Sequence, residues 1–215
     1  MNFEKLFEIQ AGLDEHIIQE KGLQGQDLLD KKILALQVEL GELANEWRGF
    51  KFWSNDQEPR TWYPNEKDIC ESCKGQPIFK KNNKIIGQCE DCDGCGVHFH
   101  NPLLEEYVDC LHFIFSIGND LEIKEVDVGE LGDYTEETET GTFNQLFSYA
   151  SALNTYLDAN LPASISKEEI QDEYGCMFAC FIGLGEKYFE FTIEQIVQAY
   201  LEKNKINHER QNTGY

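Results

Sequence analysis

Four acidic side chains stand in two pairs, and each pair has the i, i+3 spacing that places two side chains on one face of a helix. The four residues are Glu39, Glu42, Glu106 and Asp109. Like charges at this spacing weaken a helix by roughly a few tenths of a kcal/mol. Mg²⁺ would offset the repulsion, because it prefers oxygen ligands and is commonly shared with substrate phosphates. A solvated acidic face explains either pair alone, whereas the repetition of the pair favours a metal site.

A second set of side chains suited to phosphate lies near the C-terminus. Lys203, Asn207 and Arg210 share one face of an expected helix, and such a cation–amide–cation row can donate hydrogen bonds to phosphate oxygens. The same cations would also complement the negative end of the helix macrodipole. Spacing alone leaves both interpretations open.

The segment after the first acidic pair carries further candidates. Glu46 follows Glu42 by one helical turn, so it is our candidate to orient or deprotonate an attacking water. Lys51 lies between Trp47 and Trp53. A tryptophan can stack on a base and a lysine can reach a phosphate. Trp47 also continues the apolar stripe of its helix, which makes Trp53 the better candidate for stacking.

Five of the eight cysteines crowd between residues 70 and 95. Four of them form two C-x-x-C units, Cys70 with Cys73 and Cys89 with Cys92. Two such units are typical of a tetrahedral four-cysteine zinc site. A register that uses Cys95, or a ligand supplied by His98 or His100, remains an alternative. Four protein ligands leave no open position for a substrate, so we expect this zinc to be structural.

The formal net charge is −22, which sets limits on the partners of the chain. Such a surface repels phosphate backbones, so we expect no general binding to nucleic acid, and a phosphate-bearing ligand must meet a local basic site or a bridging cation. The N-terminus has no basic and apolar leader pattern, and no run reaches the length of a membrane span. We therefore expect a cytoplasmic protein without a membrane partner.

Helical periodicity surrounds one polar, cysteine-rich segment. We expect helices over residues 3–21, 26–48, 102–118, 142–159, 167–189 and 192–210, and short strands over residues 77–80 and 84–87. The acidic stretch over residues 122–141 is expected to be a loop. The chain is thus predicted to be all-α, with a helical body formed by residues 1–53 and 101–215 and a zinc-binding insertion over residues 54–100.

The two acidic pairs resemble the E-x-x-E and E-x-x-D signature of the MazG-related nucleoside triphosphate pyrophosphohydrolases. The surrounding words ELGELANEWRGFKFWS and EEYVDCLHFI are similar to those of the dimeric dUTPase branch of that superfamily. The resemblance covers most of the chain outside the insertion. It implies a MazG-like helical bundle that forms a homodimer, and it implies that the four acids hold two or more Mg²⁺ ions. The implied substrate is dUTP, and dUDP is a candidate second substrate.

The C-terminal pattern K-x-x-x-N-x-x-R-Q-x-x-x-Y is similar to a motif of the same branch. It implies that Lys203, Asn207, Arg210 and Tyr215 bind the triphosphate. The phrases CESCKGQP and CEDCDGCG in the insertion resemble the C-x-x-C-x-G repeats of DnaJ-type zinc domains. In such a domain Cys95 would occupy a position that is not a ligand.

Gln10, Leu13 and Asp14 resemble the Q-x-x-L-[DN] motif of the dimeric dUTPases, which implies that Gln10 helps to recognise uracil. An amide offers the donor and the acceptor that a uracil edge requires. We therefore predict a Mg²⁺-dependent dUTP diphosphatase that releases dUMP and pyrophosphate. The alternatives are the same chemistry on dCTP or on a broader set of nucleotides, and a zinc-stabilised interaction protein without activity, which would leave the cationic row unused.

Overall fold

The computed structural model describes residues 3–123, 126, 132–157 and 165–214, and most of these residues are helical. The α-helices are α1 (Glu4–Lys21), α2 (Leu29–Trp47), α3 (Pro102–Asp120), α5 (Glu139–Tyr156), α6 (Lys167–Gly183) and α7 (Ile193–Asn212). A π-helical turn, η1 (Leu184–Tyr188), continues α6. The prediction of a helical body with a small insertion is confirmed. No helix in the described ranges is long and apolar enough to span a membrane.

Capping side chains mark where several helices begin. Asn101 accepts a hydrogen bond from the Leu104 amide, and Pro102 occupies the first turn of α3, where the missing N–H costs nothing. Thr192 and Gln195 form a capping box at the start of α7, which satisfies two backbone amides that the helix itself leaves unpaired. These two helices begin where the sequence predicts them.

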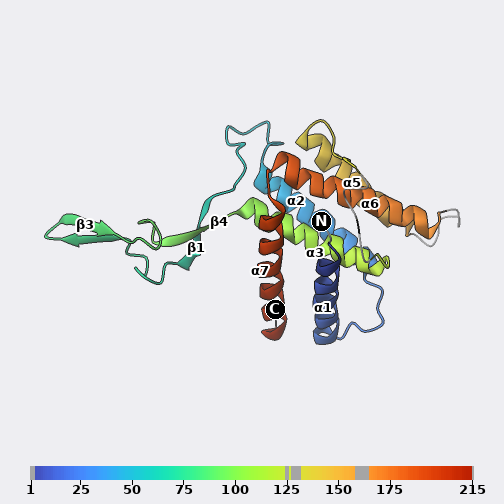
Figure 1. The fold of residues 1–215 in the computed structure, drawn as a ribbon, viewed down its shortest axis with the longest axis horizontal. Helices are drawn as coiled ribbons and strands as arrows, with labels where there is room; N and C mark the ends of the chain where they lie inside the picture. Colours follow the sequence, from blue (N-terminus) through green and yellow to red (C-terminus); the bar gives the residue numbers. More distant parts are fainter. Residues whose placement is uncertain (1–2, 124–125, 127–131, 158–164, 215) are drawn as a thin grey trace.

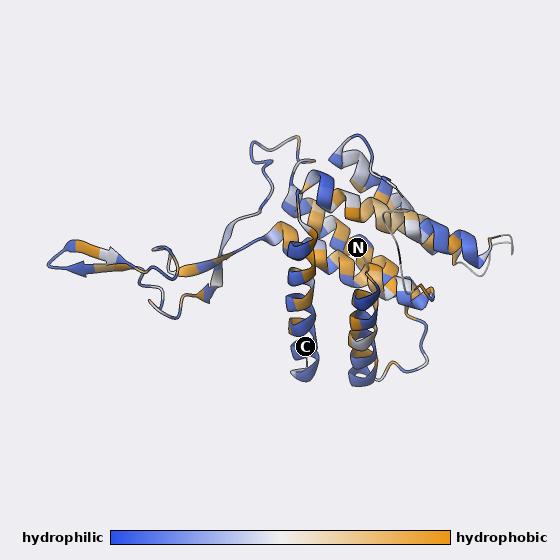
Figure 2. Cartoon of the chain, viewed as in Figure 1, coloured by the Kyte–Doolittle hydropathy of each residue, from blue (hydrophilic) through white to orange (hydrophobic). Residues whose placement is uncertain are grey.

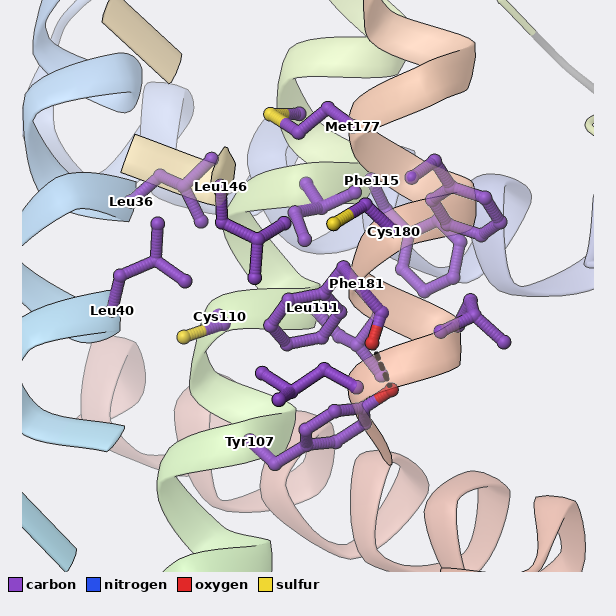
Figure 3. Close-up of a cluster of buried hydrophobic side chains, with 14 of the residues drawn as sticks. Leu36, Leu40, Tyr107, Cys110, Leu111, Phe115, Leu146, Met177, Cys180 and Phe181 are labelled. Atoms are coloured by element: carbon purple, nitrogen blue, oxygen red, sulfur yellow. Dashed lines mark hydrogen bonds between the residues drawn. The ribbon is translucent and has the colours of Figure 1, made fainter. Parts of the chain in front are cut away.

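Helix α3 forms the centre of the body. Leu36 and Leu40 of α2 approach it from one side, and Phe181 of α6 approaches it from the other (Figure 3). The buried Tyr107 of α3 stacks on Phe181 with ring centroids 4.4 Å apart, and its hydroxyl donates to the Phe181 carbonyl at 3.1 Å. Tyr107 therefore fixes the spacing between α3 and α6, because its ring packs on Phe181 and its buried hydroxyl has a hydrogen-bond partner on the same helix.

Helices α1 and α7 lie side by side and project from the body in the same direction (Figure 1). Near their free ends His16 of α1 stacks on His208 of α7, and the two Nδ1 atoms are 2.8 Å apart. The N-terminal half of α1 packs against α3 through Phe7, which meets Phe115 edge to face. Residues of these two helices line a cavity together with residues of α2 and α3.

The insertion extends away from the helices as a narrow arm (Figure 1). Strand β1 (Tyr63–Ile69) pairs antiparallel with β4 (Val97–His100), and β2 (Ile78–Lys81) pairs antiparallel with β3 (Lys84–Gln88). Asn82 and Asn83 join β2 to β3 with φ values of 53° and 60°, as a type I′ turn requires. The hairpin is predicted from the sequence, whereas β1 and β4 are not, because Pro64 and charged residues hide the alternation in β1.

Several helix ends differ from the expectation by a few residues; for example, α2 begins at Leu29 rather than at residue 26. Helix α5 begins at Glu139, because Thr138 accepts a hydrogen bond from the Gly141 amide and so caps the helix earlier. Regular α-helix ends at Gly183 rather than continuing to residue 189. There Gly185 lies against Tyr107, and a Cβ at this position would come within 2.5 Å of the tyrosine hydroxyl. Part of the expected loop over 122–141, and residues 158–159 of the expected helix, lie outside the described residues.

Candidate active site

Three of the four predicted Mg²⁺ ligands lie together where α2 and α3 meet. Carboxylate oxygens of Glu39, Glu42 and Glu106 all lie within 4.8 Å of one another. Glu39 and Glu106 are half-buried, whereas Glu42 is exposed. The two pairs, which are far apart in the sequence, converge because α2 and α3 pack along their length. Such a group of oxygens can share a divalent cation.

The fourth acid, Asp109, is held by a lysine from α7. Its carboxylate accepts a hydrogen bond from Lys203 Nζ at 2.5 Å, and both side chains are mostly buried. Burial raises the pKa of Asp109, and the charge of Lys203 opposes this rise. Lys203, predicted from the sequence as a phosphate ligand, thus lies directly beside the acidic cluster.

The cluster carries more negative charge than its surroundings favour. Burial, followed by the charges of Asp109 and Glu42, raises the pKa of Glu39 to about 7. Burial and the same two neighbours raise the pKa of Glu106 to about 7 as well. A positive charge among these carboxylates would therefore stabilise their ionised forms.

A cavity of about 280 Å³ adjoins the acids and is lined by residues of α1, α2, α3 and α7. Five of the predicted site residues are in its wall: Gln10, Glu39, Asp109, Asn207 and Arg210. Arg210 donates to the Asn207 side chain at 3.3 Å, so two members of the cationic row lie together on the α7 wall. The structure thus places acids, an amide and cationic groups around one space.

Gln10, in the lining of this cavity, hydrogen-bonds to three side chains, of which only Asp14 belongs to its motif. Its Oε1 accepts hydrogen bonds from Tyr200 at 2.7 Å and from His112 Nδ1 at 2.8 Å. Its Nε2 donates to Asp14 at 2.7 Å, and Ser116 donates to the other oxygen of Asp14 at 2.6 Å. Gln10 is only 3% exposed. The two accepted bonds occupy its carbonyl, so one N–H of the amide remains for a ligand.

His112 also lines the cavity and is missing from the sequence-based candidates. Burial lowers the pKa of its imidazole to about 3, so the ring is neutral. With Nδ1 donating to Gln10, its Nε2 is an acceptor, and this atom is buried without a hydrogen-bond partner among the described residues. The spacing of three residues from Asp109 would have placed it on the same face of α3.

Besides Glu42, Glu106 and Lys203, which lie at the acidic cluster, three further predicted residues are outside the cavity lining. Glu46 is 3.9 Å from Arg60 in an ion pair. Lys51 donates to the Asn45 carbonyl at 3.4 Å, and Trp53 is 66% exposed beside Phe50. Tyr215 lies outside the described residues.

The four predicted zinc ligands converge in the arm. Cys70 Sγ lies 3.9 Å from Cys89 Sγ, and Cys73 Sγ lies 3.7 Å from Cys92 Sγ. All four thiols are buried and fall within 4.8 Å of one another. Four sulfurs at Zn–S bonds of about 2.3 Å would stand about 3.8 Å apart in a tetrahedron. The cysteines therefore fit a zinc ion.

The alternative ligands fit less well. Cys95 is exposed and lies outside the cluster. His100 Nδ1 contacts Glu105 at 2.8 Å. His98 could share an ion only with Cys70 and Asp91, a group that leaves the other cysteines unused. The geometry favours Cys70, Cys73, Cys89 and Cys92.

An all-α body that presents acids and cationic groups to one cavity is suited to binding a phosphate-bearing ligand with a divalent cation. The chain belongs to the dUTPase family, because the model of that family matches residues 2–66 and 98–215. Membership implies a nucleotide pyrophosphohydrolase. The match omits the segment that holds the four cysteines. A search of curated proteins finds no match.

Proposed function

We propose that this protein hydrolyses dUTP to dUMP and pyrophosphate in a Mg²⁺-dependent reaction, and that dUDP is a second substrate. The observation that carries the proposal is the cavity in which Glu39 and Asp109 stand opposite Asn207 and Arg210. Family membership supplies the reaction class. A metal cofactor is proposed because the clustered carboxylates beside the cavity repel one another, and a bound cation would offset this repulsion.

Glu39, Glu42, Glu106 and Asp109 would hold the Mg²⁺ ions. When bound, these ions would polarise the phosphate oxygens and stabilise the charge that develops on the departing pyrophosphate. Lys203, now on Asp109, would turn to a phosphate oxygen once a cation replaces it there. Asn207 and Arg210, with Tyr215, would orient the remaining phosphate oxygens.

Uracil recognition would start from Gln10. Its fixed carbonyl leaves an N–H that can donate to a carbonyl of the base, and His112 Nε2 can accept a hydrogen bond from the ligand. Both atoms belong to residues that line the cavity. A buried acceptor left without a donor costs free energy, so a ligand that supplies an N–H or O–H is favoured. In this arrangement Gln10 acts as a donor alone, rather than as donor and acceptor.

Three further roles rest on spacing and side-chain chemistry and remain proposals. Glu46 would orient or deprotonate the water after release from Arg60, Trp53 would stack on the base, and Lys51 would reach a phosphate. We also propose a homodimer, since exposed apolar side chains such as Leu34 and Val38 on α2 would be covered by a second copy. The proposed boundaries of the insertion remain residues 54–100.

A substrate panel tests the proposal. The purified protein is incubated with dUTP, dCTP, dTTP and UTP, with and without Mg²⁺, and the products are separated by chromatography. We expect dUMP and pyrophosphate from dUTP, and no turnover when Mg²⁺ is chelated. Preferential turnover of another nucleotide, or release of orthophosphate alone, would contradict the assignment.

Substitutions test the acids. Glu39→Gln and Asp109→Asn should each lower dUTP turnover by at least about a hundredfold, because each removes a ligand charge from the metal site. Glu105→Gln is the matched control, since Glu105 is an exposed neighbour of Glu106 on α3. Full turnover by both site variants would contradict the assignment of these acids as metal ligands, whereas an absence of turnover in the unaltered protein would favour an interaction protein without catalysis.

A further inference from the structure

The tip of the arm is a basic surface on an otherwise strongly acidic protein. Residues 74–88 contain four lysines and no acidic residue, although the whole chain has a net charge of −22. Lys80, Lys81 and Lys84 flank the Asn82–Asn83 turn, and all three are exposed. None of the three forms an ion pair within the part of the chain that the structure describes.

Strand pairing places two of these three lysines on one face with an aromatic ring, although the register of the ladder shifts between Phe79 and Lys80. Lys81 pairs directly with Lys84, and Phe79 pairs with Gly87. Residues at alternate positions of a strand share a face, and paired residues share it across the ladder. Phe79, Lys81 and Lys84 therefore stand on one face of the hairpin. The Phe79 ring lies 3.8 Å from the point where a Cβ on Gly87 would stand, and Phe79 remains 45% exposed.

Two features of this face, the opposed lysines and the exposed phenylalanine, do not stabilise the hairpin. Like charges directly opposite each other destabilise a two-stranded ribbon, which has little stability to spare. An anion between Lys81 and Lys84 would turn that repulsion into attraction. The exposed ring beside them offers a planar surface to a base, and no core of the hairpin covers it. Lysines with an aromatic neighbour match a chain of phosphates that carries unpaired bases.

We propose that the β2–β3 hairpin binds single-stranded nucleic acid, with lysines on the phosphates and Phe79 stacked on a base. Net charge argues against nucleic-acid binding by the helical body, but the arm carries its lysines away from that body (Figure 1). Charges farther apart than the Debye length of about 8 Å at physiological salt are largely screened. The four clustered cysteines lie in the two segments that connect the β1–β4 pair to the hairpin. The hairpin carries both hydrophobic and hydrophilic residues (Figure 2). An acidic peptide with apolar side chains could also bind such a surface, so it is the alternative ligand in the test.

Fluorescence anisotropy with the full-length protein tests the proposal. The probes are labelled oligothymidylate and oligouridylate of about 15 nucleotides, at about 50 mM and about 200 mM NaCl. We expect binding at low salt, with a slope of log affinity against log salt of roughly −1.4 for the two phosphate contacts of Lys81 and Lys84. The two probes distinguish DNA from RNA as the source of the strand. No binding of either probe at low salt would overturn the proposal.

Two triple variants with the same net charge separate a local site from a general charge effect. Lys80→Glu, Lys81→Glu and Lys84→Glu together should abolish binding. The control Lys5→Glu, Lys31→Glu and Lys205→Glu changes exposed lysines of the body and should weaken binding only slightly. Both proteins should retain zinc and dUTP turnover, which reports on folding. Equal loss in both would overturn the proposal.

Phe79→Ala keeps every charge and tests stacking even if the charge reversal disturbs the hairpin. We expect affinity for oligothymidylate to fall about tenfold with an unchanged salt slope. An unchanged affinity would overturn the stacking contact. Polyglutamate serves as the competitor for the alternative ligand. If it displaces the oligonucleotide as well as unlabelled oligothymidylate does, the hairpin binds acidic protein and the proposal is wrong.

Discussion

The raised pKa values of Glu39 and Glu106 make the stability of the ion-free protein depend on pH. Their pKa values rise from 4.5 to about 7, first because of burial and then because of neighbouring carboxylates. In the unfolded chain both would ionise near pH 4.5. Between pH 4.5 and 7 the unfolded state therefore loses protons that the folded state keeps, so the free energy of unfolding falls as the pH rises through this window.

We predict that Mg²⁺ raises the melting temperature more at pH 8 than at pH 6. At the higher pH the carboxylates must be ionised, and the cation removes their repulsion, whereas at pH 6 protons compete with it. Differential scanning fluorimetry with and without Mg²⁺ measures the effect. Glu39→Gln should raise the melting temperature of the ion-free protein at pH 8 and reduce the shift that Mg²⁺ gives. An equal Mg²⁺ shift at both pH values would contradict this account.

Tyr200→Phe should relax the selection of the base. It removes one hydrogen bond, worth about 1 kcal/mol, from the Gln10 carbonyl, which can then turn toward a donor such as the amino group of cytosine. We expect the ratio of kcat/KM for dUTP over dCTP to fall several-fold. Tyr174→Phe is the matched control, because Tyr174 is a buried tyrosine that donates to the Ile114 carbonyl at 2.9 Å. A similar change of the ratio in both variants would mean that stability, not Gln10, is responsible.

Residue types and spacing alone predict the acids and the cysteines, because each set lies close together in the sequence or repeats a pattern. The neighbours of Gln10 could not be predicted in this way. Tyr200 and His112 lie 190 and 102 residues from it, and only the packing of α1 on α3 and α7 brings them together. Trp47 illustrates the opposite case, since its place on the apolar stripe predicts the buried position that it has.

At the scale of elements, local signals fix where helices and the hairpin begin. Asn101 with Pro102 and Thr192 with Gln195 are readable in the sequence, and α3 and α7 start there. The π-helical turn after Gly183 is not predicted from the sequence, and within it Gly185 packs against Tyr107, which is distant in the sequence. The pairing of β1 with β4 is likewise not predicted from the sequence, because the two strands are separated by the cysteine-containing segment; the Cys70 amide donates to the Gly96 carbonyl at 3.0 Å beside this pair.

The arm should depend on zinc, and the helical body should not. Cys70→Ser with Cys89→Ser removes two of four ligands, so we expect loss of bound zinc and rapid proteolysis within residues 67–97. The body should keep its melting temperature, and dUTP turnover should stay within about twofold. Cys95→Ser is the control, since Cys95 is exposed and lies outside the cluster. Loss of turnover together with zinc would show that the arm supports the active site.

At the scale of the whole molecule, the body and the arm divide the tasks. Replacing residues 67–97, the segment between the parts matched by the family model, with a short glycine-containing turn should leave a folded enzyme. We expect dUTP turnover within about twofold of the full protein and complete loss of oligonucleotide binding. Gel filtration of both proteins checks that the oligomeric state is unchanged. A shortened protein that folds but does not turn over dUTP would contradict this division.

Arg60 determines how the arm joins the body. Its amide donates to the Glu46 carbonyl at the end of α2, and its carbonyl accepts from the Leu103 amide at the start of α3, each at 3.0 Å. One residue thus fastens together the two chain ends from which the arm departs. Because these two hydrogen bonds fix the distance between the end of α2 and the start of α3, that distance should not depend on the length or sequence of the segment inserted after Arg60. We therefore expect that the arm can be replaced by other folded domains of differing size without loss of the helical body.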